Sequence, residues 1–255
     1  MTGGILMNRK CYFLIPAAGS GTRMGAGQPK LMRNVEGRPV ILRTIGAVAD
    51  VCRCNYADMD YRIVLVTTND LIGILQAMCA EYFPDLRISF ALGGNTRTES
   101  VSLGLNSIND ADDDDLVLVH DGARCLVTAE EITACIDGLK DHAVCASAVP
   151  VKNTLKEVDI LPSGEVKVTS TPDRSKFYEI LTPQGFKFKD IETCYMKAAD
   201  DGISATDDTA LATIYGLDVY LTKGLYSNLK ITTPEDIAIA SEIVRSRGES
   251  EPFHD

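Results

Sequence analysis

The residues with the clearest chemical character form a loop near the N-terminus. Residues 16–25 are Pro-Ala-Ala-Gly-Ser-Gly-Thr-Arg-Met-Gly, and Gln28-Pro29-Lys30 follows shortly after. Small side chains let backbone N–H groups approach a chain of phosphates closely, because no Cβ atom stands in the way. Arg23 and Lys30 bring two positive charges to the same place. The pattern predicts a loop that binds a nucleotide triphosphate and activates it for transfer.

The same loop could also belong to a dinucleotide-binding protein. Gly19 and Gly21 supply the first half of the G-x-G-x-x-G fingerprint. However, position 24 is Met where the third glycine should be, and Pro29 and Pro39 prevent one long helix from starting at the loop. No G-K-[ST] ends the loop, so it is not a P-loop either. A triphosphate is therefore the favoured ligand.

Short apolar runs alternate along the chain with segments of helical periodicity. This alternation indicates βαβ units and an α/β fold of Rossmann-like nucleotidyltransferase type, with a mostly parallel sheet covered by helices on both faces. We expect one domain over residues 1–255. The predicted strands are 12–18, 62–68, 86–92, 116–121, 144–151 and 218–222, and the predicted helices are 40–52, 71–83, 99–108, 130–142 and 234–245.

Residues 152–176 break this alternation. Two extended segments flank the turn Pro162-Ser163-Gly164, which predicts a β-hairpin. A lone two-stranded hairpin is marginally stable in water, so this arm should pack against something else. We expect a partner subunit.

Composition excludes several classes of protein. A formal net charge of −11 argues against a nucleic-acid binder, and no apolar run is long enough to span a membrane. The N-terminus lacks the apolar stretch of a secretory signal, so the cytoplasm is the expected location. The eight cysteines show neither C-x-x-C pairs nor zinc spacing, and we expect most of them to pack in the core.

Further motifs follow in order along the chain. They are Gly93-Gly94-x-x-Arg97-x-x-Ser100, His120-Asp121-x-Ala123-Arg124, Pro150-Val151-x-x-Thr154, Asp173-Arg174, Leu181-Thr182-Pro183-Gln184, Thr206-Asp207-Asp208 and Asn228-x-Lys230. Together with the first loop, these motifs resemble the 2-C-methyl-D-erythritol 4-phosphate cytidylyltransferases of isoprenoid biosynthesis, over about residues 12–243. Asn95 stands where that family commonly has Asp.

The resemblance implies a reaction and a set of site residues. CMP would pass from CTP to methylerythritol phosphate in a homodimer whose arms reach across, with Mg²⁺ held mainly by the CTP phosphates and Asp121 as a possible further ligand. Thr154, Arg174 and Thr182 would come from the partner's side of each site. The implied catalytic residues are Arg23, Lys30, Arg174 and Lys230, the nucleotide-binding residues are Pro16, Ala17, Ala18, Gly19, Gly94, Asn95 and Ser100, and the acceptor-binding residues are Asp121, Arg124, Thr154, Arg174, Thr182 and Lys230.

Other interpretations stay open at this point. A ribitol-5-phosphate cytidylyltransferase would share the nucleotide site, and a nucleotide-binding regulator would need no catalysis. Arg97 could contact a ligand or brace a loop. His120 is expected to be a hydrogen-bonded structural histidine, and Thr206-Asp207-Asp208 is expected to cap a helix.

Overall fold

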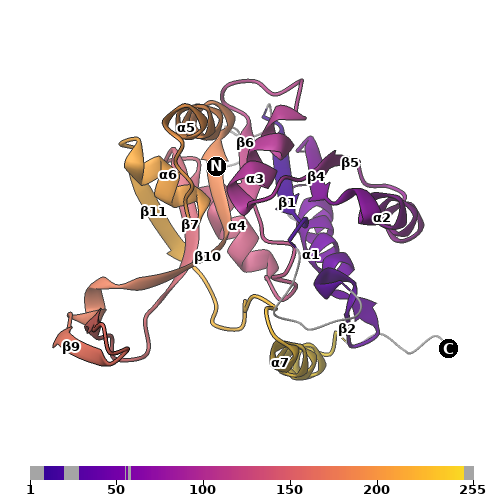
Figure 1. Cartoon of the computed structure of the whole chain (residues 1–255). Helices are drawn as coiled ribbons and strands as arrows, with labels where there is room; N and C mark the ends of the chain where they lie inside the picture. Colours follow the sequence, from indigo (N-terminus) through magenta and orange to yellow (C-terminus); the bar gives the residue numbers. More distant parts are fainter. Residues whose placement is uncertain (1–8, 20–28, 55, 57–58, 250–255) are drawn as a thin grey trace.

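A computed structural model describes residues 9–19, 29–54, 56 and 59–249 of the chain. A seven-stranded sheet runs through the middle of the molecule (Figure 1). Within this sheet β10 alone runs antiparallel to its neighbours, and all the other pairings are parallel. In spatial order the strands are β11 (Val219–Lys223), β7 (Val144–Pro150), β10 (Tyr178–Lys187), β6 (Leu116–Val119), β1 (Cys11–Pro16), β4 (Tyr61–Thr67) and β5 (Ile88–Leu92).

Helices cover both faces of the sheet and enclose two hydrophobic cores. Side chains alternate along β1, so that Phe13 and Ile15 enter one core while Tyr12 and Leu14 enter the other. This arrangement confirms the predicted α/β fold with a mostly parallel sheet. The first core is covered by α1 (Val40–Cys54), α2 (Asn69–Tyr82), α4 (Ala129–Gly138) and α7 (Pro234–Ser246), and the second by α3 (Arg97–Asn106), α5 (Phe188–Asp201) and α6 (Asp208–Ile214).

The strand order reverses next to β1. The chain moves from β1 to β4 and β5 on one side, and then returns to place β6 on the other side of β1. In open α/β sheets, ligands bind at the carboxyl ends of the strands where such a reversal occurs. The loop after β1 therefore begins at the position where a ligand site is expected.

The sequence analysis missed β10 and α5, and of α6 it predicted only the cap at Thr206-Asp207-Asp208. Pro183 and Gly185 lie within β10, and both residue types argue against a central strand. Pro183 is tolerated because the register of β10 with β7 shifts between Ile180 and Gln184. Gly185 is regularly paired, and a Cβ atom there would lie only 2.8 Å from the sulfur of Cys135 in α4. Each strand and helix that the sequence analysis did predict is present, with ends that differ by a few residues.

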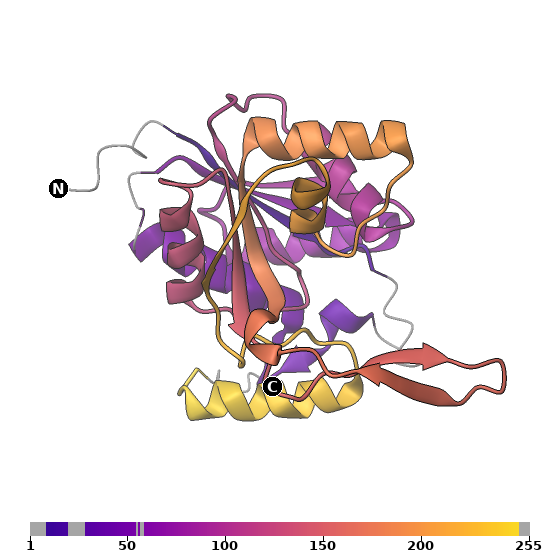
Figure 2. The same cartoon turned by 90° about the vertical axis from the view of Figure 1, so that its left-hand side faces the viewer.

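A β-hairpin stands away from the sheet, as Figures 1 and 2 show. It consists of β8 (Glu157–Ile160) and β9 (Val166–Ser170), within the arm predicted at 152–176, and the short helix η3 (Arg174–Lys176) follows it. Two further short strands, β2 (Asn34–Val35) and β3 (Arg38–Pro39), pair with each other after the short helix η2 (Lys30–Met32).

Two further expectations concern the whole chain. Among the described residues, no helix combines the length and apolar character needed to cross a membrane. All eight cysteines are free thiols, and all except Cys54 are buried, as expected for residues that pack in the core.

Candidate active site

A cleft of about 440 Å³ opens at the carboxyl ends of the strands. Its walls come from the loop after β1, the start of α3, the segment after β6 and the loop after β11. All seven residues expected to bind the nucleotide line it, together with three of the charged residues expected to act in the reaction. The lining residues are Pro16, Ala17, Ala18, Gly19, Lys30, Leu31, Gly94, Asn95, Thr96, Arg97, Ser100, Asp121, Gly122, Ala123 and Lys230.

Glycine and short hydrogen bonds shape the wall near α3. A Cβ atom at Gly93 would lie 2.4 Å from the Cβ atom of Ala18, so glycine is required for the two loops to approach this closely. The Ser100 hydroxyl accepts a hydrogen bond from the Gly94 N–H (3.1 Å) and donates one to the Thr96 carbonyl (2.8 Å). Ser100 therefore holds the shape of the loop that lines the nucleotide side of the cleft.

Asp121 lies at the centre of a group of charged side chains. Its carboxylate is 2.8 Å from Lys230 Nζ, 3.2 Å from Arg97 Nε and 3.6 Å from Arg124 Nε. Burial alone would raise the pKa of Asp121, but the surrounding cations, Arg97 first among them, lower it well below its ordinary value. The carboxylate is therefore ionised at neutral pH.

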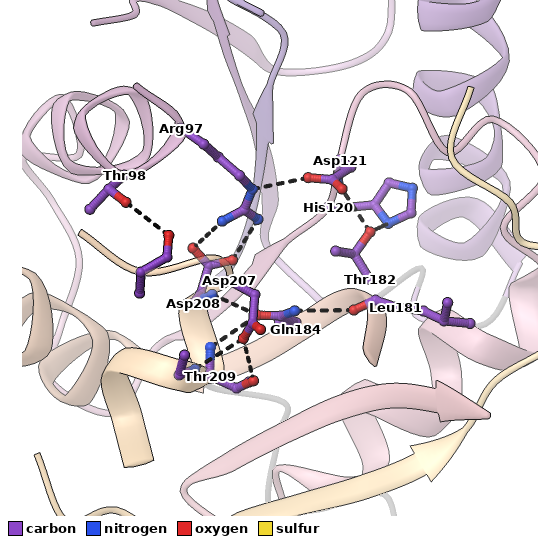
Figure 3. A network of polar contacts seen from close by, with 12 residues as sticks. Arg97, Thr98, His120, Asp121, Leu181, Thr182, Gln184, Asp207, Asp208 and Thr209 are labelled. Atoms are coloured by element: carbon purple, nitrogen blue, oxygen red, sulfur yellow. Dashed lines mark hydrogen bonds and ion pairs between the residues drawn. The ribbon is translucent and has the colours of Figure 1, made fainter. Parts of the chain in front are cut away.

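Arg97 forms a second ion pair behind the cleft (Figure 3). Its two Nη atoms lie 2.8 and 2.7 Å from the two carboxylate oxygens of Asp208, whose side chain is completely buried. Burial favours a lower pKa for Arg97, yet the carboxylate of Asp208 raises it above its ordinary value, and the guanidinium remains charged. Arg97 thus lines the cleft and connects Asp208 to Asp121, which agrees with a bracing role, and contact of Arg97 with a ligand stays a prediction.

The Thr206-Asp207-Asp208 motif has two functions in the structure. Asp207 is the N-cap of α6, since its side chain accepts a hydrogen bond from the Ala210 N–H at 3.0 Å. This confirms the expected helix cap. The pairing of Asp208 with Arg97 is additional, and the sequence analysis missed it because the two residues are 111 positions apart.

His120 is buried and uses both ring nitrogens in hydrogen bonds. Nε2 lies 3.1 Å from the Arg124 carbonyl, which can only accept, so the ring proton is on Nε2. Nδ1 then accepts from the Thr182 hydroxyl at 2.9 Å, and the same hydroxyl oxygen accepts from the Asp121 N–H at 3.1 Å. His120 is therefore the hydrogen-bonded structural histidine that the sequence analysis expected.

The position of Thr182 differs from the expectation. It was expected to come from the partner's side of the site, but in this chain it lies buried against His120 and Asp121. The difference arises because β10 pairs with β6 in the same sheet, which places Thr182 beside the end of β6 in its own chain. Thr182 fixes the backbone of Asp121 within its own subunit.

Several expected site residues lie outside the lining of this cleft. Arg124 donates to the Asn228 carbonyl at 2.7 Å and supports Asp121 from behind. Thr154 is exposed in the chain that leads to β8, and Arg174 in η3 donates to the Lys152 carbonyl at 2.6 Å. Arg23 lies outside the described residues.

The described carboxylates do not form a metal-binding cage. No group of three or more His, Cys, Asp or Glu side chains suitable for a metal ion occurs in the described part of the chain. Asp121 is the acidic residue among those that line the cleft, and Mg²⁺ in phosphate-binding sites is commonly held by one or two carboxylates plus substrate phosphates. Among the described residues of the cleft, Asp121 is thus the carboxylate that could hold a magnesium ion arriving with a nucleotide.

Comparison with known proteins assigns the chain to a family. The sequence profile of the 2-C-methyl-D-erythritol 4-phosphate cytidylyltransferases (IspD) matches residues 11–246. The chain belongs to this family. It is therefore a nucleotidyltransferase of the non-mevalonate pathway to isoprenoids, with CTP and methylerythritol phosphate as its substrates.

Relatives in this family match nearly the full length of the chain. The 2-C-methyl-D-erythritol 4-phosphate cytidylyltransferase of Nostoc sp. is 36% identical over 239 residues, which cover 94% of this chain and 100% of the relative. The crystal structure of 4-diphosphocytidyl-2C-methyl-D-erythritol synthase from Anaerococcus prevotii has a TM-score of 0.76 at 31% identity, and covers 93% of this chain and 99% of its own. The Thermus thermophilus cytidylyltransferase has a TM-score of 0.69 at 28% identity, with coverages of 91% and 98%.

Proposed function

We propose that this cleft carries out the family reaction by bringing two anions together in a positively charged pocket. The observation that carries this proposal is the group of cations around Asp121, next to a loop of small residues that leaves room for phosphates. Lys30 adds a further positive charge to the lining. The protein as a whole carries a net charge of −11, so this concentration of Lys and Arg favours a polyanionic ligand here.

The chemistry requires charge stabilisation more than proton transfer. A phosphate oxygen of methylerythritol phosphate attacks the α-phosphorus of CTP and forms the new P–O bond. The bond from the α-phosphorus to the bridging oxygen breaks, and pyrophosphate leaves with the electron pair. The products are 4-diphosphocytidyl-2-C-methyl-D-erythritol and pyrophosphate. Because the nucleophile is already an anion, fixed cations that stabilise the developing charge are the main requirement.

The lining residues suggest a division of labour. Lys30 and, by its place in the sequence, Arg23 would neutralise the triphosphate and the leaving group, while Asp121 and Lys230, which form an ion pair, would bind the acceptor. Pro16, Ala17, Ala18, Gly19, Gly94, Asn95 and Ser100 would hold the nucleotide, with Thr182 and Arg124 supporting Asp121 from behind.

Magnesium would enter this site with CTP and neutralise part of its phosphate charge. Asp121 would be its protein ligand if one is used. In the structure, Lys230 and Arg97 already bond to the Asp121 carboxylate. These two side chains would therefore hold the carboxylate in place whether it binds the acceptor or a magnesium ion.

We also propose that the chain forms one domain whose arm, residues 152–176, reaches into a second subunit. Val158 lies opposite Val168 and Ile160 lies opposite Val166, which gathers four aliphatic side chains on one face of the arm. They are between 41% and 77% exposed in the single chain. A second copy would cover this aliphatic face and would bring Thr154 and Arg174 to the acceptor site. We also propose the cytoplasm as the location of the reaction.

A pyrophosphate-release assay tests the proposal. CTP with Mg²⁺ would be incubated with methylerythritol phosphate, with ribitol 5-phosphate, or with no acceptor. We expect pyrophosphate release to be at least about tenfold faster with methylerythritol phosphate than with ribitol phosphate. The reason is that an acceptor of the wrong shape does not align its phosphate oxygen with the α-phosphorus. Equal or faster release with ribitol phosphate would move the enzyme to the other acceptor class, and no acceptor-dependent release would favour a non-catalytic regulator.

A further inference from the structure

Asp208 at the start of α6 holds Arg97 through two parallel charge-assisted hydrogen bonds. The distances from the Arg97 Nη atoms to the Asp208 oxygens are 2.8 and 2.7 Å. The Tyr195 hydroxyl of α5 donates to one of these oxygens at 2.5 Å. The Gln184 side-chain oxygen of β10 accepts the backbone N–H of Asp208 at 2.9 Å. Asp208 is thus fixed both at its carboxylate and at its backbone.

The other edge of Arg97 faces the cleft. Its Nε donates to Asp121 at 3.2 Å, and the second Asp121 oxygen lies 2.8 Å from Lys230 Nζ (Figure 3 shows the Arg97 contacts). A bidentate pair fixes the plane of a guanidinium as well as its position. With both Nη atoms engaged by Asp208, the Nε–H direction toward Asp121 is fixed as well.

Capping of α6 does not explain Asp208. Asp207 already caps this helix through the Ala210 N–H, and it also accepts from the Thr209 hydroxyl at 2.6 Å. The Asp208 carboxylate points instead to Arg97 and Tyr195, two residues from other helices. A completely buried carboxylate needs such partners, and one of them is a wall of the candidate active site.

We propose that Asp208 is a positioning residue for the transfer reaction, which clamps Arg97 so that Arg97 in turn fixes the carboxylate of Asp121 toward the acceptor. The inference rests on the proposed role of Asp121 in binding methylerythritol phosphate. It gives the second acid of the Thr-Asp-Asp motif a task in the active site although it touches no substrate.

Steady-state kinetics of the Asp208→Asn enzyme test this clamp. Asn has nearly the same shape, but its neutral amide cannot form the paired charge-assisted bonds with Arg97. We expect KM for methylerythritol phosphate to rise about tenfold or more, while KM for CTP stays within about twofold of wild type. Asp207→Asn is the matched control, because Asn is also a good N-cap, and both KM values should stay within about twofold of wild type.

A double-mutant cycle separates the clamp from general loss of packing. In an Arg97→Gln background, Asp208→Asn should change the acceptor KM by less than about twofold, since the residue through which Asp208 acts is gone. If the two substitutions instead multiply their effects on this KM, Asp208 does not act through Arg97 and the inference is wrong. It is equally wrong if Asp208→Asn raises both KM values to the same extent.

Two further variants cover the remaining outcomes. If Asp208→Asn does not fold, Tyr195→Phe carries the test, because it removes a single hydrogen bond to Asp208 and should raise only the acceptor KM, by about two- to fivefold. No change in that KM would overturn the clamp.

Asp121→Asn distinguishes the clamp from the proposed role of Asp121 in binding the acceptor. An unchanged acceptor KM there would remove the proposed role of Asp121, whereas a raised KM there with none in Asp208→Asn would remove the clamp alone.

Discussion

His120 shows how a buried polar group can serve an active site without taking part in the chemistry. It lies directly before Asp121 in the chain and bonds the Thr182 hydroxyl, which in turn receives the Asp121 N–H. Burial, more than any neighbouring charge, lowers its pKa to about 4. At neutral pH the ring is uncharged, and it acts as a rigid spacer between β6 and β10.

The first prediction follows from this low pKa. The unfolded chain binds a proton at His120 near pH ~6.5, but the folded chain binds it only near pH 4. The free energy of unfolding should therefore decrease by up to about 3 kcal/mol as the pH falls from about 6.5 to about 4. An NMR titration of the histidine ring protons measures the pKa of His120 in the folded state, and urea unfolding at several pH values measures the change in stability. The chain has three histidines, so His142→Gln and His254→Gln together identify the remaining signal as that of His120. A midpoint for His120 near pH ~6.5 would contradict the prediction.

Single residues also show where prediction from sequence ends. Lys30 was predictable from the residues themselves, because it follows a loop of small side chains after an apolar run. Asp121 and Lys230 were expected only because their motifs resemble those of the cytidylyltransferase family. The contact between Asp208 and Arg97 was not predictable. In the sequence, an acidic residue next to an N-cap looks like one that stabilises the helix dipole. Only the folded chain brings Asp208 to Arg97. The partner of Asp208 is chosen by tertiary packing alone.

At the scale of elements, α4 positions the loop that carries Lys230. Glu131 belongs to the capping box at the start of α4, where one of its oxygens accepts the Thr128 N–H at 3.1 Å. Its other oxygen accepts the Leu225 N–H and the Asn228 side-chain amide, each at 3.0 Å. One buried carboxylate thus joins a helix start to the segment after β11.

This connection gives a prediction for Glu131→Gln. The amide can keep some of these acceptor contacts but cannot satisfy all the donors that face it. We expect the free energy of unfolding to fall by about 1–3 kcal/mol, the cost of an unsatisfied buried group. Turnover should also fall, because the loop that holds Lys230 loses an anchor. Urea unfolding and pyrophosphate release measure the two effects.

Glu130→Gln is the matched control for this change. Glu130 occupies the same helical turn but is exposed, and the loop after β11 makes its contacts with Glu131. It should change stability by less than about 0.5 kcal/mol, as is usual for surface substitutions. Similar losses of unfolding free energy in both variants would mean that stability depends on the total charge of α4 and not on the contacts of Glu131 with the loop after β11.

The helices and strands differ in how clearly the sequence predicts them. Parallel strands such as β4 and β6 were predictable because they are buried on both faces and hence continuously apolar. The amphipathic spacing of Phe188, Ile191, Tyr195 and Ala198 would also have revealed α5, although the sequence analysis overlooked it. By contrast, β10 carries Pro and Gly at its centre, and local propensity gives no reason to expect it there.

At the scale of the whole molecule, the arm has aliphatic side chains that nothing in the described part of the single chain covers. Every residue of β8 and β9 is exposed, including the aliphatic face. Its base is nevertheless braced, because the Tyr226 hydroxyl donates to the Pro150 carbonyl at 2.7 Å and Lys152 Nζ lies 3.3 Å from the centre of the Tyr226 ring. A braced arm with an uncovered apolar face is the expected geometry of a hairpin that docks on another subunit.

The last prediction tests whether two subunits share each active site. Lys30 lines the cleft of its own chain, whereas Arg174 belongs to the arm and lies outside that lining. Lys30→Ala and Arg174→Ala should each lower the turnover of the pure homodimer by about 10²–10³, the effect of losing one preorganised cationic group. A heterodimer of the two variants would hold one site with both defects and one site with neither. Mixed subunits should therefore recover pyrophosphate release toward half the wild-type value per dimer, in proportion to the heterodimer fraction found by native mass spectrometry. Should heterodimers form without any recovery, each arm would serve its own subunit, and the proposal of a shared site would be wrong.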